Sequence, residues 1–150
     1  MNFARKVIVP VNMDNNLGEV LKPLRGLEFL NRCEIQLVHV FQTTNMAYGF
    51  GEYSLIFPLE TDRKKFEESV VSTLSKVSSE LFPPNFQGKV ISKCLFSEDP
   101  KDTFCKYVTE EKADLIIVPA RKKHGWYESS FAQFVTKHTE ANILILKNNS

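Results

Sequence analysis

The segment Ala113-Asp114-Leu115-Ile116-Ile117-Val118 contains four consecutive apolar residues, three of them β-branched. A run of this kind is typical of a central parallel strand that is covered on both faces. Near the end of the chain, Ile143-Leu144-Ile145-Leu146 forms a second apolar run. Between the two runs, four residues recur at the i, i+3, i+4 and i+7 spacing of one helix face: Phe131, Phe134, Val135 and His138. We therefore predict a strand, a helix and a closing strand in this part of the chain.

The same alternation of strand and helix extends back to the start of the chain. We predict strands at Lys6–Val11 and Ile35–Phe41, and a more polar, edge-like strand at Val90–Phe96. Apolar residues at helical spacing follow each of these strands, at 17–27, 66–81 and 104–108.

Prolines indicate where several of these helices begin, bend or end. Pro23 lies inside the first helical pattern and predicts a kink, because proline lacks a backbone N–H. Pro83-Pro84 ends the second pattern, and Asp99-Pro100 is typical of an N-cap followed by the first helical residue. The order β-α-β-α-β-α-β-α-β predicts a single α/β domain over residues 1–150, with a mostly parallel sheet between two helix layers.

The composition narrows the classes of function. Of the 150 residues, 43% are hydrophobic and 25% charged, and the formal net charge of +1 gives no reason to expect a nucleic-acid-binding face. No window has the length and apolarity of a membrane span, and the first residues lack a secretory signal. The cysteines Cys33, Cys94 and Cys105 lie far apart, which favours reduced, buried thiols in a cytoplasmic protein over a metal or disulfide site.

Three segments resemble the universal stress protein family. Val7-Ile8-Val9-Pro10-Val11-Asn12 is similar to the family's opening strand, which ends in a proline and, two residues later, an aspartate. Leu37-Val38-His39-Val40 is similar to the second strand, whose end lies against adenine in nucleotide-binding members. The unit from Ala113 to Leu146 resembles the family's last strand–loop–helix–strand unit. The resemblance implies five parallel strands in the order 3-2-1-4-5, with ATP at the carboxyl ends of strands one and four, where open α/β sheets bind ligands.

The residues that would hold phosphate depart from the family's pattern. That pattern is Gly-x-x-Gly, nine intervening residues and then Gly-Ser or Gly-Thr. Pro119 and Lys122 stand at the two glycine positions, Ser129-Ser130 stands for the last pair, and the six residues Lys123–Glu128 replace nine. Asn12 replaces the aspartate, so no carboxylate is available there for magnesium. The candidate cofactor-binding residues, with ATP or AMP as the candidate ligand, are Pro10, Val11, Asn12, Val40, Pro119, Ala120, Arg121, Lys122, Ser129 and Ser130.

Three segments leave alternatives open. The basic loop that begins at Arg121 either supplies cations to an anion at the serine-capped helix start, or is a solvated loop before an ordinary N-cap. Trp126 and Tyr127 either fill the phosphate space or form a subunit contact. The long aromatic connection at 42–60 is either a lid, an interface or a segment packed across the sheet edge.

These observations predict a non-catalytic stress-response module with a degenerate nucleotide site. The alternative is an adenine-nucleotide binder with an altered phosphate loop and slow ATP hydrolysis. His39 lies in an apolar strand and is interpreted, like His138, as a core histidine. Because Ile143–Leu146 is an apolar edge strand, and because the family commonly pairs this strand across a two-fold axis, we expect a homodimer. Partners in a membrane or among nucleic acids are not expected.

Overall fold

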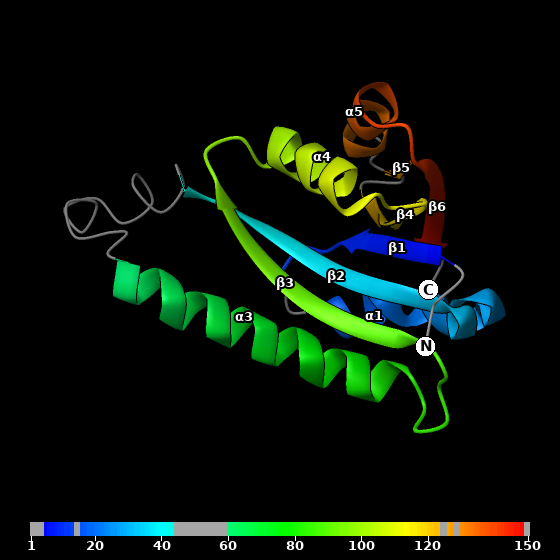
Figure 1. Ribbon diagram of the computed structural model, residues 1–150. Helices are drawn as coiled ribbons and strands as arrows, with labels where there is room; N and C mark the ends of the chain where they lie inside the picture. Colours follow the sequence, from blue (N-terminus) through cyan, green and yellow to red (C-terminus); the bar gives the residue numbers. More distant parts are fainter. Residues whose placement is uncertain (1–4, 14–15, 44–59, 124–125, 128–129, 149–150) are drawn as a thin grey trace.

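The chain folds into a sheet with helices on both faces (Figure 1). The computed structural model describes residues 5–13, 16–43, 60–123, 126–127 and 130–148. The strands are β1 Arg5–Pro10, β2 Cys33–Gln42, β3 Lys89–Ser97, β4 Leu115–Lys123, β5 Trp126–Tyr127 and β6 Asn142–Asn148. The helices are α1 Leu17–Leu21, α3 Glu60–Leu81, α4 Pro100–Glu111 and α5 Ser130–His138, with 3₁₀ helices η1 Lys22–Gly26 and η2 Glu28–Arg32.

Five parallel strands form the body of the sheet, in the order β3-β2-β1-β4-β6. The predicted α/β fold and the predicted order 3-2-1-4-5 are confirmed, the fifth predicted strand being β6. The central strands are apolar on both faces because helices cover both: Val7, Ile8 and Val9 of β1 are all fully buried.

The two faces of the sheet carry two separate cores. On one face, α1, η1, η2 and α3 contribute their buried leucines and valines to a cluster with Val7, Val9 and Leu37. On the other face, α4 and α5 pack on Ile8 and Ile116, which belong to the second cluster. Figure 1 shows α3 and α1 on one side of the sheet and α4 and α5 on the other.

The helix boundaries follow the capping signals in the sequence. At the start of α4, the Asp99 carboxylate accepts a hydrogen bond from the Asp102 N–H at 3.4 Å, and Pro100 is the first helical residue. The predicted helix over 17–27 is kinked at Pro23, as expected, because α1 ends at Leu21 and gives way to 3₁₀ turns. Among the described residues, each helix is either too short or too polar to span a lipid bilayer.

Two expectations for the C-terminal part are wrong. The basic segment was predicted to be a loop, but β4 continues through Arg121–Lys123, and Lys122 and Lys123 pair antiparallel with Tyr127 and Trp126 of β5. Trp and Tyr favour a pleated strand, which extends the ladder beyond the apolar run. His138 was predicted to face the core, but it is exposed, because the buried face of α5 is centred on Ala132 and Val135.

Candidate functional site

A cavity of about 490 Å³ lies at the carboxyl ends of the central strands. Its volume falls within the range of about 300–1,000 Å³ that is typical of small-molecule pockets. The described residues that line it are Pro10, Val11, Asn12, Leu17, Val20, Leu21, Val38, Val40, Pro100, Lys101, Phe104, Val118, Pro119, Ala120, Ser130 and Phe131. Strands β1, β2 and β4 and helices α1, α4 and α5 therefore all contribute to its wall.

The cavity opens where two neighbouring strands separate. Strands β1 and β4 pair only at Val7 with Leu115 and at Ile8 with Ile116. Beyond these pairs, β1 stays with β2 as far as Pro10, and β4 stays with β6 as far as Arg121. The strand order reverses at this point, and in open α/β sheets the resulting crevice is where ligands bind.

The turn after β1 is fixed by two hydrogen bonds with β2. The Val11 N–H donates to the Val38 carbonyl at 2.9 Å, and His39 Nδ1 donates to the Val11 carbonyl at 2.9 Å. Burial lowers the pKa of His39, while its bond to Val11 opposes that shift, so the imidazole is neutral near pH 7. His39 was predicted to be a satisfied core histidine; it is satisfied but half-buried, and its hydrogen bond holds the backbone beside the exposed Asn12.

Helix α4 brings an aromatic ring and a cation to the cavity. Phe104 is 1% exposed and forms part of the wall, where its ring lies 5.3 Å from that of Phe131 on α5, centroid to centroid. Lys101 is exposed and lies in the first turn of α4, at the cavity. The turn before α4 sets the direction of the helix, and it is held by a hydrogen bond from the Asp99 N–H to Ser97 Oγ at 2.9 Å.

The described wall of the cavity is mostly apolar and carries one cation. Of the described lining residues, Lys101 alone carries a formal charge, and none is a carboxylate, a cysteine or a histidine. Cys94 and Cys105 are buried elsewhere, and burial raises both thiol pKa values, to about 11 for Cys94. Within the described ranges, no group of three or more His, Cys, Asp or Glu side chains could hold a metal ion. The arrangement can hold a largely apolar ligand with one anionic group.

The structure brings most of the predicted site residues together. Seven of the ten line the cavity: Pro10, Val11, Asn12, Val40, Pro119, Ala120 and Ser130. Arg121 and Lys122 follow them along β4, in the hairpin with β5 rather than in a loop. Ser129 lies outside the described residues, as do 44–59 of the aromatic connection.

Sequence reasoning missed the contribution of α4. Pro100, Lys101 and Phe104 all line the cavity, although none was a predicted site residue. The signal was present, because Asp99-Pro100 marked a helix that starts at the carboxyl edge of the sheet, the same edge as the predicted pocket.

A model of the universal stress protein family matches residues 4–147. The chain belongs to the universal stress protein family. Sequence comparison with curated proteins finds no match.

Solved structures share this fold along nearly the whole chain. The hypothetical protein PH0823 is 23% identical, with a TM-score of 0.70 over 97% of this chain and 97% of its own. A universal stress protein in complex with cAMP is 10% identical, with a TM-score of 0.60 over 99% of this chain and 100% of its own. A universal stress protein family protein from Arabidopsis thaliana with AMP bound is 18% identical, with a TM-score of 0.51 over 97% of this chain and 93% of its own. Because these sequence identities are low, the structural similarity establishes the fold alone.

Proposed function

We propose that this universal stress protein is a non-catalytic regulatory module that binds an adenine nucleotide reversibly in the cavity between β1 and β4. The observation that carries the proposal is the cavity of about 490 Å³, whose wall includes residues at the ends of both strands. Two proteins of similar fold, solved with AMP and with cAMP bound, support adenine nucleotides as the ligand class.

The two halves of the cavity suit different parts of such a ligand. Val38, Val40 and Val118 give an apolar wall of the kind that accepts a base and a ribose. The phosphate side departs from the family's glycine pattern at Pro119, which has no N–H to donate, and at Lys122. We therefore expect binding through the nucleoside, with a weaker and altered phosphate site.

The proposal assigns no chemistry to the bound nucleotide. Hydrolysis of a phosphate ester or anhydride needs a positioned general base or a metal ion. The described wall offers neither a carboxylate nor a histidine, and Asn12 occupies the position of the family's aspartate. The expected role is a conformational response to occupancy rather than turnover.

We also propose that the functional unit is a homodimer joined through β6. This strand pairs with β4 on one side, and among the described strands none lies against its other side. Ile145 on β6 is 42% exposed, and an unpaired apolar edge strand readily pairs with a second chain. Sedimentation at micromolar concentration tests this, and a monomer there overturns it.

Titration calorimetry with AMP, cAMP and ATP tests the ligand proposal. Val40→Phe places a larger side chain in the wall of the cavity, and we expect it to weaken AMP binding at least tenfold. Val90→Phe is the matched control, since Val90 is half-buried in β3 and does not line the cavity. Ligand at 100 times its Kd stabilises the folded state by about 2.7 kcal/mol, so a thermal shift gives a second readout. No heat and no shift at millimolar nucleotide would overturn the proposal.

A further inference from the structure

The charge at the cavity wall is positive. Lys101 is the one charged residue among the described residues that line it, and every other lining side chain there is apolar or neutral. Because none of the described lining residues is a carboxylate, the ammonium group makes the cavity favourable for an anion. A negatively charged part of a ligand is therefore expected to lie beside α4.

The position of the Lys101 side chain is set by both helices on this face. Lys101 is the second residue of α4, and helical side chains lean toward the N-terminus of their helix, which here is the end at the cavity. Its Nζ lies 5.8 Å from the centroid of the Phe134 ring on α5. Phe134 comes one turn after Ser130 on the same helix face, and Ser130 lines the cavity. Lys101 and Ser130 thus approach the cavity from α4 and α5 respectively.

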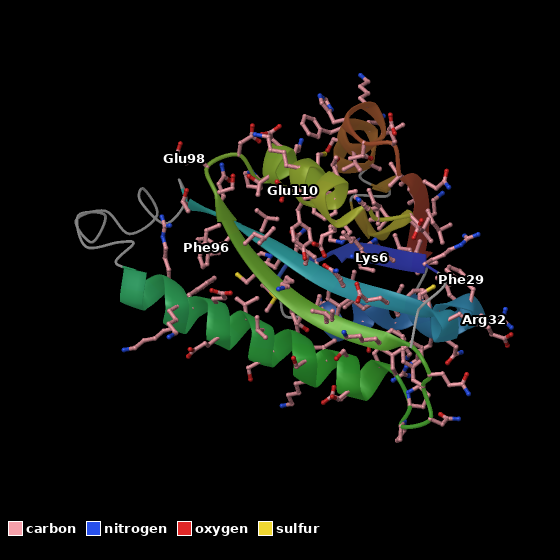
Figure 2. All side chains as sticks on the ribbon, viewed as in Figure 1. Lys6, Phe29, Arg32, Phe96, Glu98 and Glu110 are labelled. Atoms are coloured by element: carbon pink, nitrogen blue, oxygen red, sulfur yellow. The ribbon has the colours of Figure 1, made fainter. Side chains whose placement is uncertain are left out.

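The two carboxylates closest to Lys101 in the sequence, Asp99 and Asp102, are engaged with other groups. The Asp99 carboxylate caps α4 through the Asp102 N–H, and the Asp102 carboxylate pairs with Lys106 Nζ at 3.0 Å. Glu98 lies on the turn before α4, outside the residues that line the cavity (Figure 2). The described interaction of the Lys101 ammonium is with the Phe134 ring, which leaves its N–H donors available to a ligand oxygen.

We infer that Lys101 recognises the phosphate of the bound ligand, and that the ligand is a nucleoside monophosphate taken up without a divalent cation. This inference rests on the proposed function and names the residue that determines its specificity. A lysine ammonium at the start of α4, together with the first turn of α5, replaces the backbone donors that the glycine pattern would provide. A magnesium complex of a triphosphate is disfavoured because no described lining residue offers magnesium a carboxylate.

The test compares AMP with adenosine, which differ by the phosphate alone. Lys101→Met removes the charge and keeps an unbranched apolar stem, so the packing against the cavity is largely retained. We expect its AMP affinity to fall about tenfold or more, while its adenosine affinity changes less than twofold. Lys137→Met is the matched control on the neighbouring helix α5, because Lys137 is exposed and does not line the cavity. Both affinities of this control should stay within twofold of the wild type.

Further binding measurements test the metal-free assignment, the choice of a monophosphate and the role of Lys101 separately. AMP affinity measured with EDTA should equal that measured with magnesium, and a drop of more than threefold in EDTA would overturn the metal-free assignment. ATP with magnesium should bind more weakly than AMP, and tighter binding would overturn the assignment to a monophosphate. If Lys101→Met bound AMP as tightly as the wild type, the role of Lys101 would be lost while nucleotide binding stood. If the wild type bound neither AMP nor adenosine, the proposed function and this inference would both fall.

Discussion

The amide of Gln36 forms the centre of a buried polar cluster beneath α4. Its side chain is 2% exposed and lies in β2 between the buried apolar residues Ile35 and Leu37. The amide nitrogen donates to Glu111 at 2.8 Å and to Glu34 at 3.2 Å, and the Tyr107 hydroxyl donates to the amide oxygen. Burial, together with the nearby Glu111 and Glu34, raises the pKa of Tyr107 to about 12, so this hydroxyl remains protonated and able to donate.

In the hydrogen bond between Tyr107 and Gln36, removing the donor should cost more stability than removing the acceptor. Tyr107→Phe leaves the fully buried Gln36 oxygen without its donor, which costs about 1–3 kcal/mol of folding free energy. Gln36→Met should cost about 1 kcal/mol or less, because the groups it releases, Tyr107, Glu111 and Glu34, are only half-buried and can reach water. The double variant removes donor and acceptor together. We therefore expect it to be about 1 kcal/mol more stable than the sum of the two single effects predicts.

Urea denaturation followed by circular dichroism measures all three free energies. In a chain of this length, a loss of about 2 kcal/mol lowers Tm by about 4–8 °C, which is readily resolved. Gln133→Met is the matched control on an exposed face of α5 and should change stability by less than about 0.5 kcal/mol. If the loss of stability in the double variant equalled the sum of the two single losses to within about 0.3 kcal/mol, the coupling between Tyr107 and Gln36 would be refuted, and with it the account of this cluster.

Two further predictions concern His39 and the edge strand. The lowered folded-state pKa of His39 means that its contribution to stability is present above the unfolded value of about 6.5 and is lost as the pH falls through the folded pKa. His39→Gln should therefore flatten the fall in stability between pH 7 and pH 5, and an equal slope in wild type and His39→Gln would contradict this. Ile145→Lys should convert the proposed dimer into a monomer at micromolar concentration, because it places a charge on the edge of β6 at which no other described strand lies. Ser72→Lys, at an exposed position of α3, which packs against β3 at the opposite edge of the sheet, should remain a dimer, and dimeric Ile145→Lys would argue against this interface.

Much of the fold could be predicted because its signals are local. The run Leu115–Val118 is buried as expected for a strand covered on both faces, and the Asp99-Pro100 pair starts a helix where capping preferences place one. The three cysteines are buried, as the sequence predicted. Seven of the predicted site residues share one cavity because the ends of parallel strands meet at one edge of a sheet.

The remaining features depend on contacts between segments that are distant in the sequence. The sequence alone determined an alternating α/β chain with its strands, caps and breaks, because these depend on residues within a few positions of each other. Tertiary structure decided that β1 and β4 separate after Ile8 and Ile116, since each strand continues with a different partner. It also brought Lys101 from α4 to a cavity whose other walls come from the ends of β1 and β4, and it turned Arg121–Lys123 into a strand by pairing it with β5 and β6. Such choices depend on which surfaces meet when helices pack on a sheet, and no local pattern encodes that.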